Sequence, residues 1–201
     1  MNVLLHTFGC KANQYDTEVV RQRLEAAGCR IVTSAADADA AVVNSCTVTH
    51  VGEAKMRRFV RRLARTGAGI RTVVMGCAAA VDDGRLAALP GVTAVVAGAD
   101  DAAVADALGA PRVAPSPLRG FALQGRGWLK IQDGCDEHCT FCATVLARGA
   151  SRSRDPDALV AEASLLAERH AELVLTGVHI GAYGTDRDDG WTLSRLAARL
   201  I

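Results

Sequence analysis

Short apolar runs alternate with helix-type segments through the first 110 residues, and this alternation constrains the fold of the chain more than any other feature. We expect strands at Val3–Phe8, Ala40–Asn44, Arg71–Met75 and Ala94–Ala97, a minor strand at Ile31–Thr33, and helices at Asp16–Ala27, Thr49–Arg65 and Asp100–Leu108. Alternation of this kind is typical of a parallel sheet wrapped by helices. The predicted class is therefore α/β.

A proline-rich segment divides the chain. Residues 109–119 hold three of the five prolines and are predicted to be a linker between a domain at 1–108 and a second, incomplete unit at 120–201. In the second unit we expect strands at Trp128–Ile131 and Glu172–Thr176, and helices from Asp155 and at Thr192–Leu200. Asp155 is a suitable N-cap and Pro156 a suitable first helical residue. The second unit is therefore also β/α.

The composition limits the possible functions. Half of the residues are apolar, 22% are charged and the net charge is +1, so no overall charge directs the chain to nucleic acid or to a membrane. The segment Met1–His6 lacks the basic start of a signal peptide, and no apolar run approaches the ~20 residues of a membrane span. We therefore expect a cytoplasmic protein with reduced thiols and no membrane partner.

Six of the seven cysteines form two sets of three. One set follows the predicted strands by two residues each, and the other is a C-x3-C-x2-C loop; the sets are Cys10, Cys46 and Cys77, and Cys135, Cys139 and Cys142. Because ligands of an open parallel sheet gather at the carboxyl ends of its strands, the first set is expected to share one sheet edge. Thiolates are the usual ligands of iron–sulfur clusters. Three thiolates per set predict two clusters, each with one iron open to a small molecule.

Other interpretations of the cysteines stay open. Taken singly, each cysteine of the first set could be an ordinary buried residue. The second set could hold zinc with His138, although a ligand adjacent to Cys139 would strain the backbone. Cys29 has no matching position, so we expect it to pack in the core.

One predicted helix carries a stripe of arginines at three- and four-residue spacing: Arg57, Arg58, Arg61, Arg62 and Arg65. The stripe could bind RNA phosphates, and it could equally be a solvated helix face. With only 4% aromatic residues, a base-stacking platform is not evident from the sequence.

Six segments together resemble a known enzyme family. They are residues 7–16, 43–49, 75–77, 129–142, 147–154 and 175–181, and they are distributed in register along nearly the whole chain. At these residues the chain resembles the radical S-adenosylmethionine (SAM) methylthiotransferases, in particular the group that modifies threonylcarbamoyladenosine in tRNA. The run Lys11-Ala12-Asn13-Gln14-Tyr15 favours this group over its siblings, which act on isopentenyladenosine tRNA or on a ribosomal protein.

The resemblance implies a fold and an activity. The fold would be a flavodoxin-like open parallel sheet with helices on both faces, followed by the first part of a radical SAM (β/α) partial barrel. The activity would be transfer of a methylthio group to C2 of threonylcarbamoyladenosine beside the anticodon, started by a 5′-deoxyadenosyl radical from SAM. Cys135, Cys139 and Cys142 would hold the radical SAM [4Fe–4S] cluster. The other set would hold an auxiliary [4Fe–4S] cluster that presents the sulfur.

The resemblance also implies partners and further contacts. The partners would be the tRNA anticodon loop and an electron donor such as flavodoxin or ferredoxin, with the protein a monomer. The residues expected to contact SAM are Phe141, Thr176 and Gly177, and those expected to contact SAM carboxylate or RNA phosphate are Arg148, Arg152 and Arg154. Each group has an ordinary alternative. Phe141 could be a buried aromatic residue, Thr176 and Gly177 could form a strand-to-loop turn, and the arginines could be surface charge. Asn13 and Asn44 could orient cysteine ligands or simply cap helices and form turns.

Two features depart from the family pattern. Val145 and Leu146 stand where the family usually has Pro-Tyr, and the chain stops inside its second unit. We therefore expect a truncated chain that is inactive alone. A cluster- or zinc-binding module without catalysis and an electron-transfer protein are the alternatives from other classes; the electron carrier is disfavoured because such proteins usually give each cluster four ligands.

Overall fold

The computed structural model describes residues 1–47, 50–66, 69–122 and 125–201. The chain divides into two compact units, residues 1–115 and residues 116–201, which we call unit 1 and unit 2. Each unit is described by itself. Among the described residues, no helix combines the length and apolar character needed to cross a membrane.

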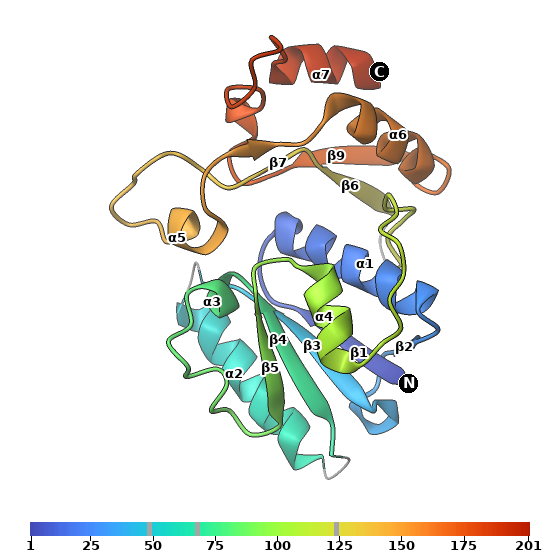
Figure 1. Ribbon diagram of the computed structural model, residues 1–201, viewed down its shortest axis with the longest axis vertical. Helices are drawn as coiled ribbons and strands as arrows, with labels where there is room; N and C mark the ends of the chain where they lie inside the picture. Colours follow the sequence, from blue (N-terminus) through green and yellow to red (C-terminus); the bar gives the residue numbers. More distant parts are fainter. Residues whose placement is uncertain (48–49, 67–68, 123–124) are drawn as a thin grey trace. The chain divides into compact units, whose positions relative to one another are not determined.

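Unit 1 is built on a five-stranded sheet whose strands all run parallel (Figure 1). Its strands are β1 (Asn2–Thr7), β2 (Arg30–Val32), β3 (Ala40–Ser45), β4 (Arg71–Gly76) and β5 (Val92–Ala97), in the order β2-β1-β3-β4-β5. Its helices are α1 (Lys11–Ala26), α2 (His50–Arg65), α3 (Cys77–Ala80) and α4 (Asp101–Leu108), with a 3-10 turn η1 (Ala35–Asp37). The predicted α/β class is confirmed, and the strand order is that of flavodoxin-like sheets.

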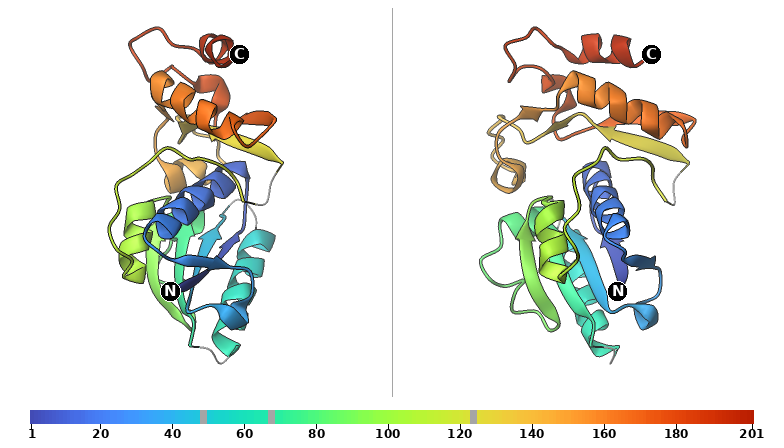
Figure 2. Two further views of the ribbon diagram at one scale, coloured as in Figure 1. Left: turned by 90° about the vertical axis from the view of Figure 1, so that its right-hand side faces the viewer. Right: turned by 45° about the vertical axis from the view of Figure 1, so that its right-hand side comes forward.

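The alternation of side chains along each strand explains why helices cover both faces of the sheet. In β3, Ala40 and Val42 pack in the apolar cluster formed with α1 and α4, whereas Ala41 and Val43 pack in the cluster formed with α2. All six residues of β3 are buried, as expected for a central parallel strand covered on both sides. Figure 2 shows α1 and α4 on one side of the sheet and α2 on the other.

Unit 2 contains one parallel strand–helix–strand unit. Strand β6 (Arg126–Lys130) pairs in parallel with β9 (Glu172–Thr176), and α6 (Pro156–Ala167) connects them. The Asp155 side chain accepts a hydrogen bond from the backbone N–H of Ala158 at 3.0 Å, with Pro156 as the first helical residue, which confirms the predicted helix start. The remaining elements are β7 (Gln132–Asp133) paired antiparallel with β8 (Arg152–Ser153), α5 (Thr144–Arg148), η2 (Ile180–Ala182) and α7 (Leu193–Leu200).

The clearest difference from the sequence prediction is the start of α1. The helix begins at Lys11, whereas the sequence predicts a start at Asp16. The prediction is wrong because the first turns bury polar residues, including Asn13 and Asp16, and so lack an apolar periodicity. Strand β5 likewise begins at Val92, two residues before the predicted Ala94. Helix α2 is described from His50; the predicted start at Thr49, and Val48 of the family-like segment, lie outside the described residues. The short elements α3, α5, β7 and β8 were not predicted.

Candidate functional site

Three of the four cysteines of unit 1 lie at the carboxyl ends of three adjacent strands. Cys10 occupies the N-cap position of α1 after β1, Cys46 follows β3 directly, and Cys77 begins α3 directly after β4. Because β1, β3 and β4 are neighbours in the sheet, three separate loops bring these residues to one edge. We call this group the sheet-edge cysteines. Cys29 is not part of it and packs in the apolar cluster of α1 and α4.

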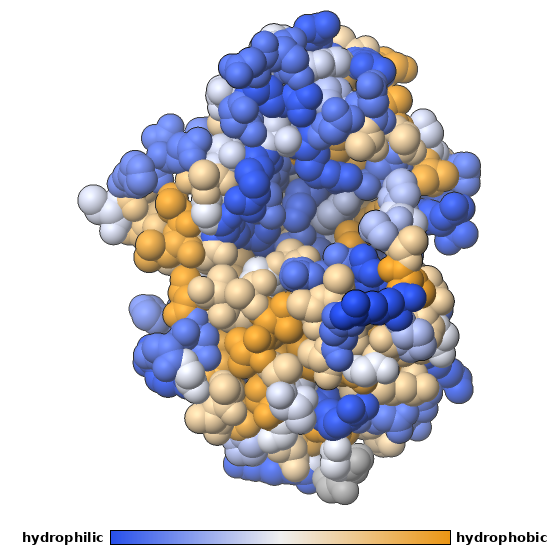
Figure 3. Space-filling model, viewed as in Figure 1, coloured by the Kyte–Doolittle hydropathy of each residue, from blue (hydrophilic) through white to orange (hydrophobic). Residues whose placement is uncertain are grey.

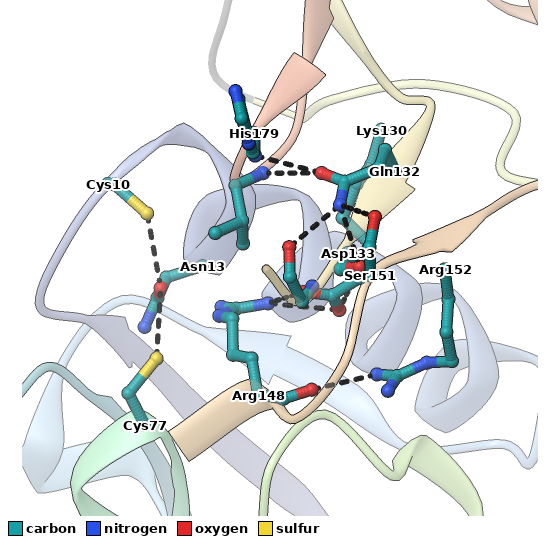
Figure 4. A network of polar contacts seen from close by, with 12 residues as sticks. Cys10, Asn13, Cys77, Lys130, Gln132, Asp133, Arg148, Ser151, Arg152 and His179 are labelled. Carbon is teal, nitrogen blue, oxygen red and sulfur yellow. Dashed lines mark hydrogen bonds and ion pairs between the residues drawn. The ribbon is translucent and has the colours of Figure 1, made fainter. Parts of the chain in front are cut away.

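One buried asparagine links two of these thiols. Cys10 Sγ lies 3.3 Å and Cys77 Sγ 3.9 Å from the same atom, Asn13 Oδ1, as Figure 4 shows. Cys46 is buried beside them, and a Cβ built on Gly9 would lie 3.1 Å from its Cβ. Gly9 also has a φ of +132°, so glycine lets the chain pass closely between Cys10 and Cys46.

A network of amide hydrogen bonds holds the loops of the sheet-edge cysteines together. Asn13 Nδ2 donates to Asn44 Oδ1 at 3.0 Å and to the carbonyl of Ser45 at 2.9 Å, while Asn44 Nδ2 donates to the carbonyl of Asn13 at 2.8 Å. Both asparagine side chains are fully buried. The α1 residue Asn13 therefore ties the first cysteine loop to the loop after β3, which is neither helix capping nor a simple turn.

The chemistry of the sheet-edge cysteines fits an iron–sulfur cluster. Three thiols from adjacent loops supply the sulfur ligands that such clusters use. Within residues 1–47, 50–66, 69–122 and 125–201, no three His, Cys, Asp or Glu side chains are placed to hold a single metal ion.

The second cysteine set lies in a loop of unit 2 between β7 and α5. Cys135 and Cys142 anchor the loop through their backbone N–H groups, which donate to Gly149 and Cys139 carbonyls. Cys139 and Cys142 are exposed, and His138 is exposed beside them. The hydrogen bond between Cys142 Sγ and Thr144 Oγ1, 3.1 Å long, lowers the pKa of this thiol. Exposed thiols in an irregular loop can reach the corners of one cluster.

Gln132 organises this loop, a role that the sequence analysis did not identify. Its Nε2 donates to the carbonyl of Gly134 at 2.7 Å and to Ser151 Oγ at 2.9 Å, and its Oε1 accepts from the backbone N–H of His179 at 2.9 Å (Figure 4). The residue is fully buried. One side chain thus connects the start of the cysteine loop, the residue before β8 and the segment after β9. The only indication of this role in the sequence is the position of a glutamine between the apolar strand β6 and the cysteine loop.

Two of the three residues expected to contact SAM lie near this loop. Thr176 ends β9, and a Cβ on Gly177 would lie 2.8 Å from the carbonyl of Gln132. Phe141 lies within the loop itself, but it is 90% exposed, so it does not shield the loop as a buried aromatic. Figure 3 shows apolar side chains gathered over the segment that carries α5, where Leu146 is also exposed.

A pocket of about 300 Å³ lies between the cysteine loop and the segment after β9. Its lining residues are mostly polar: Asp136, Glu137, Ser151, His179, Gly181, Ala182 and Thr185. Cys135 Sγ approaches His179 Nδ1 to 3.9 Å beside it. The pocket is large enough for part of a nucleoside-sized ligand.

The arginines of unit 2 form contacts within the unit. Arg148 binds both carboxylate oxygens of Asp133, at 2.9 and 3.1 Å, and Arg154 forms a two-pronged ion pair with Glu162. Burial alone would raise the pKa of Asp133, but Lys130 and Arg148 lower it below its ordinary value. Arg152 is exposed and donates to the carbonyl of Arg148. Arg148 and Arg154 therefore hold the cysteine loop and α6 in place.

The arginine stripe of unit 1 lies along α2. Arg57 pairs with Glu53 on the preceding turn at 2.8 Å. The other four members, Arg58, Arg61, Arg62 and Arg65, are exposed. The stripe therefore presents a basic surface.

Comparison with known proteins finds a family profile that matches within unit 1 and relatives that are similar along nearly the whole chain. Residues 2–98 match the sequence profile of an uncharacterized protein family, UPF0004. The threonylcarbamoyladenosine tRNA methylthiotransferases of Bacillus subtilis and Thermotoga maritima are 35% and 32% identical, over 98% and 92% of this chain and 48% and 45% of their own lengths. The tRNA-2-methylthio-N(6)-dimethylallyladenosine synthase of Syntrophobacter fumaroxidans is 34% identical over 98% of the chain and 48% of its own length. The chain thus spans about half the length of these relatives.

Proposed function

Because the chain is similar to methylthiotransferases over nearly its whole length, we propose that the whole protein transfers a methylthio group to C2 of threonylcarbamoyladenosine beside the tRNA anticodon. Within it, unit 1 would form the methylthiotransferase domain and unit 2 the beginning of the radical SAM domain. Its partners would be tRNA and a small electron-donor protein, with the protein acting as a cytoplasmic monomer.

One observation carries the proposal: each unit places one set of three cysteines in loops that follow its strands. In unit 1 the sheet-edge cysteines follow β1, β3 and β4. In unit 2 the C-x3-C-x2-C loop follows β6 and β7, and Gln132 ties it to the end of β9. Three-cysteine sets suit clusters that keep one iron open for chemistry rather than clusters that only carry electrons.

The two sets would hold two [4Fe–4S] clusters with different tasks. Cys135, Cys139 and Cys142 would bind the cluster that chelates SAM, and the sheet-edge cysteines would bind the auxiliary one. When bound, these groups would supply one-electron cleavage of SAM and a transferable sulfur. Thr176 and Gly177 would contact SAM through the backbone at the end of β9. Phe141 would take part only after its exposed ring moves onto the ligand.

Residues of this chain would position the clusters and exclude water. Asn13 Oδ1 accepts hydrogen bonds from the Cys10 and Cys77 thiols and would hold both side chains at the sheet edge before they bind iron. Gln132 would keep the second cysteine loop against the end of β9. Arg152 and the arginine stripe would attract RNA phosphates, whereas Arg148 and Arg154 would act mainly through their ion pairs within unit 2.

A second candidate substrate is dimethylallyladenosine in tRNA. The synthase of Syntrophobacter fumaroxidans is 34% identical to this chain, close to the 35% of the threonylcarbamoyladenosine enzyme of Bacillus subtilis. The run Lys11–Tyr15 after the first cysteine favours threonylcarbamoyladenosine. Nucleoside analysis of tRNA from cells with and without the whole protein separates the two, because only the modified nucleoside that loses its methylthio group is the substrate.

The cluster assignment is tested by anaerobic reconstitution of the chain with iron and sulfide. We expect about eight irons per chain, about four of them lost in Cys10→Ala and a different four in Cys135→Ala. The matched control is Cys29→Ala, which removes the one cysteine outside both sets and should keep all the iron. Addition of SAM should change the electron paramagnetic resonance signal of Cys10→Ala but not of Cys135→Ala. Stoichiometric zinc without iron would overturn the proposal in favour of a structural module.

A further inference from the structure

Unit 1 carries a pocket that is lined by a different kind of residue from the pocket of unit 2. Its volume is about 340 Å³. Three of its lining residues are aromatic rings and three are cations: His6, Phe8 and Phe59, and Lys55, Arg58 and Arg62. We call it the aromatic–basic pocket. Neither set of cysteines contributes to it.

The aromatic wall is assembled by β1 and α2. His6 and Phe8 are two residues apart, so they point to the same face of the sheet, the face that α2 covers. The His6 and Phe59 rings are stacked, with centroids 4.2 Å apart, and Phe8 lies 4.5 Å from His6 and 5.8 Å from Phe59. Strand β2 pairs only with residues 2–4 of β1, so it leaves the far end of β1 uncovered. All three rings are half-buried and keep part of their surface open.

The cations come from one face of α2. Lys55, Arg58 and Arg62 follow the three- and four-residue spacing that places side chains on one side of a helix, together with Phe59. The Arg62 guanidinium carbon lies 5.3 Å from the centre of the Phe59 ring. Among the described residues, no acidic side chain forms an ion pair with any of these three cations, in contrast to Arg57 and its partner Glu53. Their charge therefore remains available to an anionic ligand.

Stacked rings beside unpaired cations match the chemistry of a nucleotide. Single-stranded nucleic acids are bound by aromatic side chains that stack on bases and by cations that contact the backbone. A volume of about 340 Å³ lies within the range of small-ligand pockets. An acidic protein partner would need the cations but would have no use for the rings.

We propose that the aromatic–basic pocket binds one unpaired nucleotide of RNA, with the base against the wall of His6, Phe8 and Phe59 and the flanking phosphates on Lys55, Arg58 and Arg62. This inference rests on the proposed function, because it names the part of unit 1 that would grip the RNA substrate. It also changes the interpretation of the arginine stripe: only the members that line the pocket would contact RNA specifically.

The proposal is tested by fluorescence anisotropy with a labelled single-stranded RNA of about ten nucleotides, titrated with the whole 201-residue chain. We expect Phe59→Leu, which keeps an apolar side chain but removes the ring, to weaken binding at least about fivefold, and Phe59→Tyr to retain it. Arg58→Gln should weaken binding and reduce its salt dependence. The matched charge control is Arg112→Gln, an exposed arginine of unit 1 outside the pocket, which should bind as the parent does.

A base-free polyanion separates stacking from charge. Phe59→Leu should bind heparin as the parent chain does, while Arg58→Gln should bind it more weakly. If Phe59→Leu binds RNA with parental affinity, the pocket is a charged surface only, suited to an acidic protein, and the proposal is wrong. Photocrosslinking of 4-thiouridine RNA gives a second readout that needs no variant: crosslinks at Phe8 or Phe59 support the pocket, and crosslinks confined to other segments contradict it.

The iron content of the same samples distinguishes this inference from the proposed function. If the clusters assemble but Phe59→Leu binds RNA as tightly as the parent does, the pocket proposal is wrong and the proposed function is unaffected. If the chain takes up no iron but Phe59→Leu weakens RNA binding, the proposed function is wrong and the pocket proposal is supported. Equal iron in Phe59→Leu and the parent shows that the variant is folded.

Discussion

Asn13 and Asn44 hold each other in a reciprocal pair, because each amide nitrogen donates to an oxygen of the other residue, at 3.0 and 2.8 Å. Asn44 Nδ2 also donates to Thr17 Oγ1 at 3.0 Å. Both side chains are fully buried. The pair connects α1 to the end of β3, so it sets the distance between the loops of Cys10 and Cys46.

Removal of this pair should destabilise unit 1. In Asn44→Leu, Asn13 Nδ2 loses one acceptor, and the Asn13 carbonyl and Thr17 Oγ1 each lose a donor inside the fold. We expect these losses to lower the free energy of unfolding by about 2–4 kcal/mol. Chemical denaturation followed by circular dichroism measures the change. Asn2→Leu provides the comparison, since the Asn2 side chain makes an exposed hydrogen bond to the carbonyl of Asp37 and its loss should cost less. Equal stability of the two variants would contradict the role assigned to the pair.

Gly76 should tolerate no side chain. Its φ is +95°, and a Cβ would lie 2.2 Å from Asn44 Oδ1 and 2.6 Å from the carbonyl of Ser45. Gly28 also has a positive φ, +81°, but nothing lies within 4 Å of its Cβ position. We therefore expect Gly28→Ala to lose about 1–2 kcal/mol from backbone strain alone, and Gly76→Ala to lose clearly more. Thermal unfolding of both variants checks this, and a smaller loss for Gly76→Ala would be inconsistent with the contact.

Arg154 should matter more for folding than for binding. Its partner Glu162 has a side chain only 2% exposed, so Arg154→Met would break the two-pronged ion pair of a buried carboxylate and destabilise unit 2 by about 3–5 kcal/mol. The double variant Arg154→Met with Glu162→Leu should recover much of this loss. The control is Arg126→Met, whose pair with Glu172 is exposed on both sides and should contribute less than about 1 kcal/mol. Denaturant titration that gives equal losses for Arg154→Met and Arg126→Met would refute the assignment.

The stability of unit 1 should fall below pH 6.5 because of His6. Burial lowers the pKa of His6 below the ordinary 6.5, and the nearby Arg62 guanidinium lowers it further. Between 6.5 and the lowered value, the unfolded chain binds a proton that the folded chain does not, so stability rises with pH across this window. Lys55 and Arg58, which line the same pocket, add to the positive surroundings.

His6→Gln tests this pH dependence. The variant should lose the part of the pH slope that lies just below 6.5 and should differ from the parent least in stability at the acidic end of the window. Unfolding midpoints measured in steps of pH, with His50→Gln as an exposed histidine control on α2, give the comparison. An unchanged slope in His6→Gln would show that His6 is not the responsible group.

Local sequence patterns predicted most of the framework. Strands β1, β3, β4 and β9 and helices α4 and α7 were predicted within one residue at both ends, and the start of α6 within one residue. Apolar periodicity and caps such as Asp155 act over a few residues, which makes such ends predictable. The start of α1 was missed because Asn13 and Asp16 are buried as polar residues. The aromatic wall was missed too: His6 and Phe59 are far apart in sequence, and only the packing of α2 on β1 brings their rings together.

The sequence by itself determined the α/β class, the position of each sheet-edge cysteine after a strand, and the compact spacing of the cysteine loop, since these depend on side-chain order along the chain. Only the tertiary structure decided which strands are neighbours, that Asn13 lies between Cys10 and Cys77, and that Gln132 ties the second loop to β9. Contacts between distant residues depend on the order of strands and the facing of helices, which the burial of the whole core selects.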